Sequence, residues 1–201
     1  KSGVEKDRIY FVGNTMIDTL KKNQKNFIKP DLWKDFNLKK GNYIMITLHR
    51  PSNVDIKSKL KELISEIIYG SKNLPVIFPV HPRTNKIIQD LEISYPNLKL
   101  VTPLSFLEFN YLVKHSFAII TDSGGITEET TVMGIPCLTI RDNTERPETV
   151  FIGTNELVGS NPKNLRKYMK KLFNGNWKKG GIPELWDGNT SKRIIDIIIS
   201  L

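Results

Sequence analysis

The sequence predicts an α/β fold in which a parallel sheet carries helices on both faces. Short apolar runs of strand length alternate with longer segments whose apolar residues recur at helical spacing, along all 201 residues. This alternation is typical of parallel sheets covered by helices. Several expected strands also end in polar residues, and ligands of such folds bind at the carboxyl ends of the strands. A hydrophobic content of 39% is enough for a sizeable core.

The elements follow from apolar spacing and from helix start signals. Residues 9–12 predict a short strand ended by Gly13, and Asn14 is expected to cap a helix over 15–22. Residues 23–41 are polar and predict a connection with a short helix near 31–36. Further strands are expected at 43–47, 75–80, 98–101, 117–120, 136–140 and 156–158. Further helices are expected at 56–69, 84–91, 106–114, 126–133, 162–173 and 190–201, and 141–148 is expected to be a loop.

Composition narrows the classes of function. The net charge is +9, but the lysines are dispersed and no basic helix interleaved with aromatic residues stands out. We therefore expect solvated helix faces and no binding of nucleic acid. Apolar runs are far shorter than the about 18 residues that a membrane span needs, and nothing resembles a signal peptide, so a soluble cytoplasmic protein is expected. The single cysteine, Cys137, lies in an apolar run and is expected to be buried.

The segment 119–129 combines a strand, two glycines and the start of a helix. Gly124 and Gly125 let a ligand approach the backbone because no Cβ intervenes. Unpaired N–H groups and the helix dipole favour an anion at the helix start, so the pattern suits a phosphate. The alternative is an ordinary turn between strand and helix, with Ser123 as the N-cap.

Arginines and histidines follow several of the expected strands. A guanidinium group offers phosphate a planar fork, and this is the favoured interpretation for Arg146, with pairing to Glu145 or Glu148 as the alternative. Arg141 is expected to be structural. The arginines near strand ends are Arg50, Arg83, Arg141 and Arg146.

His49 and His81 directly follow strands, where a histidine is often only a hydrogen-bonded part of the structure. It can also exchange a proton near neutral pH or stabilise a leaving phosphate. His115 ends a helix and is expected to be structural. Three histidines at unrelated spacings with one cysteine do not make a zinc site, so no metal and no cofactor are expected. Glu128 or Glu129 could bind a ribose diol, although acids are favoured in the first turns of helices anyway.

Together these motifs resemble the non-hydrolysing UDP-N-acetylglucosamine 2-epimerases. The resemblance runs in order over nearly the whole chain, and the segments at 121–129 and 144–148 are the most specific. The matching segments are Val12–Asp18, Thr47–Arg50, Pro79–Pro82, Thr121–Glu129, Gly134–Pro136 and Thr144–Glu148.

The resemblance implies two Rossmann-like domains arranged as in GT-B glycosyltransferases, with this chain similar to the second. Residues 1–22 would end the first domain and link it to a nucleotide-binding domain over 23–201, and the N-terminal domain would be absent. The first residue is not methionine, and the chain is expected to be a fragment or one subunit of a split enzyme.

The resemblance also implies roles for individual residues. His49 would be catalytic and Arg50 would face the diphosphate or the sugar. Ser123, Gly124 and Gly125 would hold the diphosphate, Glu129 the ribose, Phe109 the uracil, and Arg146 the phosphate or sugar, with His81 lining the cleft. UDP would be eliminated to a glucal and added back after a proton reaches the opposite face of C2.

In the family the carboxylates that move this proton belong to the first domain, so the chain alone is expected to bind UDP without turnover. The complete protein is expected to form a homodimer. One departure is the segment 49–55, which keeps His-Arg but differs from the commoner His-Arg-Arg-Glu form and leaves the exact sugar open. A GT-B glycosyltransferase domain and a non-catalytic sugar-nucleotide-binding module are the alternatives.

Overall fold

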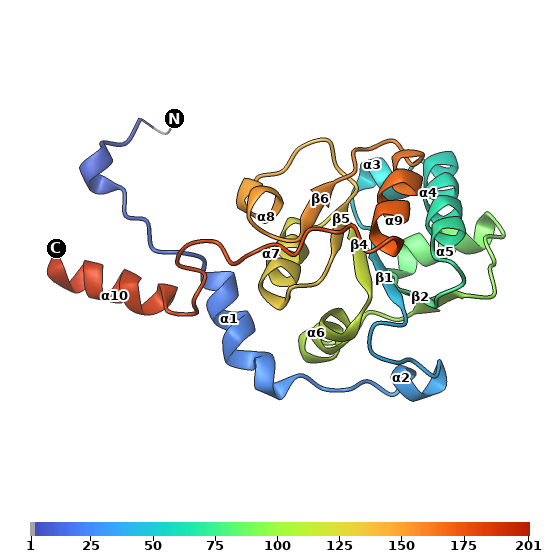
Figure 1. Ribbon diagram of the computed structural model, residues 1–201, viewed down its shortest axis with the longest axis horizontal. Coiled ribbons are helices and arrows are strands. Elements are labelled where there is room, and N and C mark those ends of the chain that lie inside the picture. Colours follow the sequence, from blue (N-terminus) through green and yellow to red (C-terminus); the bar gives the residue numbers. More distant parts are fainter. Residues whose placement is uncertain (1–2) are drawn as a thin grey trace.

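The computed structural model describes residues 3–201 and contains one sheet of six parallel strands, ordered β3-β2-β1-β4-β5-β6 (Figure 1). This is the strand order of dinucleotide-binding Rossmann domains, and it confirms the predicted fold class. The strands are β1 (Ile44–Thr47), β2 (Val76–Pro79), β3 (Leu98–Val101), β4 (Ala118–Thr121), β5 (Cys137–Thr139) and β6 (Asn155–Leu157).

Successive residues of the central strands enter two separate cores. Ile44 and Ile46 of β1 pack on one face of the sheet and Met45 on the other, and Ile120 and Ile119 of β4 divide in the same way. All five side chains are fully buried. Parallel strands that are covered on both faces read as continuous apolar runs, which is why these strands could be found in the sequence.

Helices cover each face. The larger core is closed by α3 (Pro51–Val54), α4 (Lys57–Gly70), α5 (Pro82–Asp90) and α9 (Asn164–Phe173). The other is closed by α2 (Leu32–Asp35), α6 (Phe106–His115) and α7 (Gly124–Met133). The remaining helices are α1 (Thr15–Asn23), α8 (Pro147–Phe151) and α10 (Thr190–Ser200), with 3-10 turns at Lys6–Arg8 and Gln24–Asn26.

Helices α1 and α10 lie together at the side of the domain, away from α4 and α5 (Figure 1). Ile17 and Leu20 of α1 are buried. Asp18 joins the two helices by accepting hydrogen bonds from the main-chain N–H of Thr190 (3.1 Å) and Ser191 (2.6 Å). These bonds satisfy N–H groups that the first turn of α10 leaves unpaired.

Residues 9–12 do not form the strand that their apolar run predicted. Ile9, Tyr10 and Phe11 are 57%, 48% and 65% exposed, and no strand lies beside them in the described chain. β propensity needs a neighbouring strand to be realised, and here none is in reach. Gly13 follows with φ +106°, and a Cβ at this residue would lie 2.4 Å from the carbonyl oxygen of Leu185.

Two short helices were not predicted. Helix α3 occupies the segment after β1, and α8 begins inside the expected loop at 141–148. Each has a proline at its first position, Pro51 and Pro147. The fixed φ of proline suits that position, and this was the available signal.

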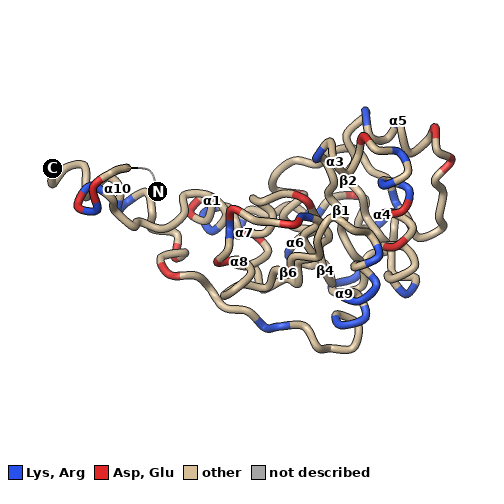
Figure 2. The backbone as a smooth tube through the Cα atoms, turned by 90° about the horizontal axis from the view of Figure 1, so that it is seen from above, with Lys and Arg blue, Asp and Glu red and all other residues tan. Residues whose placement is uncertain are grey.

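Charged residues occur along most of the helices. Figure 2 shows acidic and basic residues mixed around α4 and α5 and basic residues along α9. Between residues 3 and 201, no helix combines the length and the apolarity needed to cross a membrane. Cys137 is buried as expected, and burial raises the pKa of its thiol to about 12.

Candidate functional site

The carboxyl ends of β1 and β4 bring two of the predicted motifs together. The strands pair in register, so Thr47 lies opposite Thr121, and their hydroxyl oxygens are 2.6 Å apart. His49 and Arg50 follow β1, while Asp122 and Ser123 follow β4. The parallel register therefore delivers the His-Arg pair and the glycine turn to the same edge of the sheet.

Asp122 connects these two loops. Its carboxylate is fully buried and accepts hydrogen bonds from the main-chain N–H groups of His49 (3.2 Å) and Arg50 (3.0 Å) and from the side-chain amide of Asn53 (3.0 Å). It also lies 2.8 Å from Nδ1 of His49. Arg50 Nε donates in return to the main-chain oxygen of Asp122 (3.0 Å). Asp122 therefore fixes the loop that carries His49 and Arg50.

The turn into α7 is open on its outer side. Ser123 is the N-cap residue, but its side chain makes no capping bond in the described structure. Its N–H is instead held by the hydroxyl of Thr121 (3.0 Å). A Cβ at Gly125 would meet nothing within 4 Å, and one at Gly124 would meet only Arg141 Nη1 at 3.9 Å. Neither glycine is required by internal packing, which leaves the space in front of the helix start free for a ligand.

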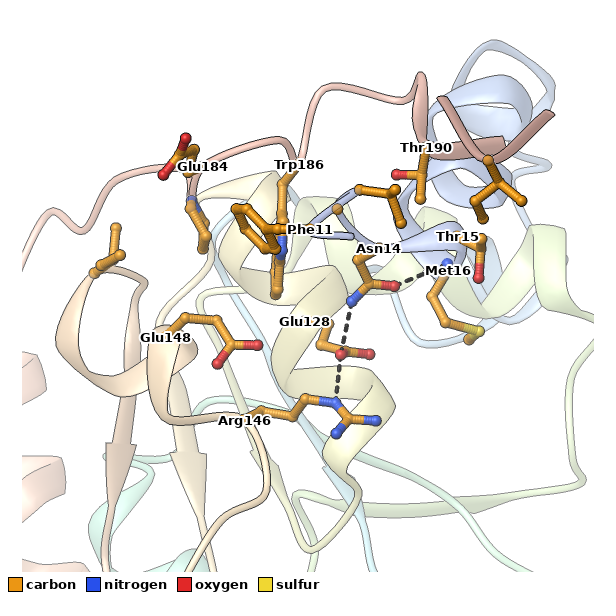
Figure 3. A pocket seen from close by; sticks show the side chains of 15 residues that line it. Phe11, Asn14, Thr15, Met16, Glu128, Arg146, Glu148, Glu184, Trp186 and Thr190 are labelled. Carbon is orange, nitrogen blue, oxygen red and sulfur yellow. Dashed lines mark hydrogen bonds and ion pairs between the residues drawn. The ribbon is translucent and has the colours of Figure 1, made fainter. Parts of the chain in front are cut away.

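Arg146 is held by a partner that the sequence did not suggest. Its Nε lies 2.5 Å from Oε1 of Glu128, a buried carboxylate that also accepts from Nδ2 of Asn14 at 2.8 Å (Figure 3). Arg146 Nη1 donates to the main-chain oxygen of Glu145 at 3.1 Å. The predicted alternatives were pairs with Glu145 or Glu148 through their carboxylates. The Arg146 side chain remains 44% exposed, so part of the guanidinium is available to a ligand.

Arg141 has the structural role that was predicted for it. Its two terminal nitrogens donate to the two carboxylate oxygens of Glu145, at 2.9 and 2.6 Å. This fork holds the pKa of Glu145 down at about 2. Arg83, also named as a candidate, pairs with Asp55 at 2.9 Å.

Glu129 is buried on α7, one residue beyond the Glu128 pair. Burial raises its pKa to about 7, a hydrogen bond with Asn110 lowers it, and the nearby Glu128 raises it. Oδ1 of Asn110 has no hydrogen-bond partner within residues 3–201. Carboxyl groups whose pKa is shifted this far cluster at functional sites, so Glu129 and the adjacent Asn110 are candidates for ligand binding.

The remaining candidates lie on neighbouring elements. His81 is the N-cap of α5, and its Nδ1 accepts from the N–H of Arg83 at 3.3 Å. Phe109 of α6 is partly buried against the smaller core. His115, expected to be structural, has its Nδ1 2.7 Å from the main-chain oxygen of Tyr111 and packs against the ring of Trp33.

A cavity of about 690 Å³ opens beside Arg146, where α1 and the segment before α10 meet α7 and α8 (Figure 3). It lies apart from the His49 loop. Its lining mixes the apolar Phe11 and Trp186 with the carboxylates Glu128, Glu148 and Glu184. Among residues 3–201, no three His, Cys, Asp or Glu side chains gather as a metal ion would require.

Sequence reasoning missed three of the residues that build this edge. Asp122 was noted only as a polar strand end, Glu128 only as an alternative to Glu129, and Asn14 only as a helix cap. Asn14 does cap α1 through Oδ1, which accepts from Met16 N at 2.9 Å. A carboxylate directly after an apolar strand was the available signal for Asp122, but its partners follow a different strand.

Comparison with known proteins places these features in one family. Residues 1–199 match the family model described as UDP-N-acetylglucosamine 2-epimerase. A relative of that name from Methanocaldococcus jannaschii is 37% identical over 98% of this chain and 56% of its own length. One from Campylobacter jejuni is 32% identical over 99% of this chain and 56% of its own.

Solved structures of this family also match the fold of this chain. The M. jannaschii UDP-GlcNAc 2-epimerase, in complex with UDP-GlcNAc and UDP, superposes with a TM-score of 0.81 and covers 99% of this chain and 57% of its own. The S. aureus MnaA–UDP structure gives 0.83 at 29% identity, covering 98% and 54%. The match to GT-B-type epimerases confirms that part of the predicted fold class. This chain spans little more than half the length of its relatives and aligns with their C-terminal half; it belongs to the UDP-N-acetylglucosamine 2-epimerase family.

Proposed function

We propose that this chain is the nucleotide-binding half of a non-hydrolysing UDP-N-acetylglucosamine 2-epimerase, which interconverts UDP-GlcNAc and UDP-ManNAc. The observation that carries the proposal is the joining of the His49–Arg50 loop to the glycine turn through Asp122. It sets Arg50 and His49 beside an open helix start, where the guanidinium group suits a diphosphate and the imidazole can act on its departure.

The nucleotide would lie along the start of α7. The N–H groups of Gly124 and Gly125 and the side chain of Ser123, which makes no capping bond in the described chain, would hold the diphosphate. The open space in front of both glycines supports this. Glu129 would accept hydrogen bonds from the ribose diol. Phe109, one turn from the N-terminus of α6, would contact the uracil.

The sugar end of the substrate would extend towards Arg146, whose guanidinium is oriented by Glu128 and partly exposed. His81 would line the nucleotide cleft next to His49, because β2 lies beside β1 in the sheet.

The reaction requires groups on two faces of the sugar. A base removes the C2 proton, the C2–H electron pair forms the C1=C2 bond, and the C1–O pair leaves with the diphosphate. His49, as a cation or proton donor, would stabilise the departing oxygen. Re-addition of UDP after protonation on the opposite face of C2 inverts that carbon.

The carboxylates that move the C2 proton would come from a first domain. Residues 1–22 would link that domain to the nucleotide-binding domain, residues 23–201, and the two domains would face each other across the cleft. The complete protein would be a homodimer. On this proposal the chain alone binds UDP and lacks half of its acid–base groups.

His49→Ala tests the proposal. UDP affinity of this chain should change little, whereas UDP-GlcNAc turnover should fall by about 10²-fold or more when the first domain is supplied. Deuterium incorporation at C2 in heavy water measures turnover, and the unsubstituted chain alone should incorporate none. Normal turnover by the His49→Ala protein would refute the role of His49. Transfer of the sugar to an added acceptor, with no exchange at C2, would identify a glycosyltransferase instead.

A further inference from the structure

The buried carboxylate of Asp122 contacts the histidine ring as well as the backbone of its loop. Oδ1 lies 2.8 Å from Nδ1 of His49. Oδ2 receives the N–H of Arg50 and the amide of Asn53, each at 3.0 Å. The main-chain N–H of His49 lies 3.2 Å from both oxygens. Oδ1 is therefore the oxygen that contacts the ring, Oδ2 is the one that binds Arg50 and Asn53, and both lie near the N–H of His49.

This arrangement determines which ring nitrogen carries the proton in the neutral histidine. An ionised carboxylate can only accept hydrogen bonds, so Nδ1 of His49 must be the N–H donor at 2.8 Å. The hydrogen bond at one ring nitrogen sets the state of the other. Nε2 is then left to exchange a proton, and it lies on a side chain that is 61% exposed.

We propose that Asp122 is the positioning residue for His49, holding its ring in the Nδ1–H tautomer so that Nε2 alone gains and loses the catalytic proton. The consequence for turnover rests on the proposed function, whereas the tautomer itself does not. A proton given up by Nε2 would leave a neutral ring already oriented by Asp122, and the next proton would return to the same nitrogen.

The two other histidines provide internal references for a nitrogen-15 NMR experiment on this chain. Nδ1 of His115 faces the carbonyl oxygen of Tyr111 at 2.7 Å and must donate. Nδ1 of His81 accepts the N–H of Arg83 at 3.3 Å and must be unprotonated. At a pH where the rings are neutral, His49 should share the pattern of His115 and differ from His81. A protonated Nε2 on neutral His49 would overturn the proposal.

Asp122→Asn should reverse the tautomer. The amide oxygen is expected at the Oδ2 position, because the Arg50 N–H and the Asn53 amide point there. The amide NH₂ then faces Nδ1 of His49, which must become an acceptor, and the proton moves to Nε2. An unchanged tautomer in a folded Asp122→Asn protein would refute the inference.

Asn53→Ala is the matched control. It removes one donor to Oδ2 and leaves the ring contact at Oδ1, so it should lower stability while His49 keeps the Nδ1–H state. Loss of that state in Asn53→Ala would show that loop order, and not the carboxylate contact, sets the tautomer. If Asp122→Asn does not fold, the unsubstituted protein and the Asn53→Ala variant still decide the question.

A kinetic measurement separates this inference from the proposed function. With the first domain supplied, Asp122→Asn should reduce kcat by about 10²-fold or more with a smaller effect on KM. A reversed tautomer with unchanged kcat would refute the catalytic consequence. If a folded chain shows the predicted tautomers but does not bind UDP, the proposed function is refuted and the Asp122–His49 pairing still stands.

Discussion

The unusual titration of Glu129 gives the sharpest quantitative prediction. Burial raises its pKa from an ordinary 4.5 to about 7 in the folded protein, so the folded state binds this proton more tightly than the unfolded state. Its contribution to stability is therefore fully present below pH 4.5 and is lost as the pH rises through about 7. At 1.36 kcal/mol for each pH unit between the two values, the loss is ~3 kcal/mol.

Glu129→Gln tests this magnitude, because glutamine has a similar shape and no charge. Urea denaturation should show that the variant differs little from the unsubstituted protein at pH 5 and is more stable by up to ~3 kcal/mol at pH 8. Glu62→Gln, on α4, controls for the loss of one negative charge. Equal pH dependence of the Glu129→Gln and unsubstituted proteins would refute the assigned burial cost.

The same carboxyl group links UDP binding to pH. A carboxylate accepts both hydrogen bonds of a ribose diol, whereas the protonated form must use one oxygen as a donor. UDP affinity should therefore rise between pH 6 and 8 and binding should release a proton, measured by calorimetry in buffers of different ionisation enthalpy. Glu129→Gln should bind UDP more weakly and release fewer protons than the unsubstituted chain, since the terminal phosphate of UDP titrates at about pH 6 in both. Equal proton release by the two proteins would place the titrating group elsewhere.

Two further substitutions test the phosphate and sugar contacts. Arg146→Lys keeps the charge but loses the fork, so kcat/KM of the two-domain protein should fall by an amount equivalent to about 1.5–3 kcal/mol; unchanged kinetics would make Arg146 a structural partner of Glu128. Gly125→Ala fills open space in front of α7, so its thermal stability should hold or rise by up to about 1 kcal/mol while UDP binding weakens. Gly134→Ala, at φ +69°, should lower thermal stability and leave UDP binding unchanged. Full UDP affinity in Gly125→Ala would contradict the assigned phosphate site.

The sequence was most informative where a single segment carries the whole signal. β1 and β4 are buried on both faces, so their apolar runs could be recognised without knowledge of their neighbours. The same reasoning failed at residues 9–12, because a strand needs a partner and the apolar run alone does not say whether one is present. Such segments are decided by tertiary context.

The sequence could predict which residues lie at the strand ends of the candidate site, but not which of them contact each other. His49 and Ser123 could be named because each follows a strand, and parallel strands deliver their ends to one edge. The contact of Asp122 with His49 joins residues 73 positions apart, and that of Glu128 with Asn14 joins residues 114 apart. No local pattern encodes such pairs, so the only protein partners weighed for Arg146, as the alternative to a ligand, were the adjacent Glu145 and Glu148 and not Glu128.

Titration of this chain with UDP by calorimetry tests the central claim most directly. The glycine-fronted start of α7, with Arg50 and Arg146 nearby, should give saturable binding of UDP. Uridine should lose most of this affinity, because it lacks the diphosphate that these groups recognise. The affinity should be modest, since on the proposed function a first domain would exclude water from the phosphates. A folded chain that binds neither compound, or binds both equally, would contradict the account.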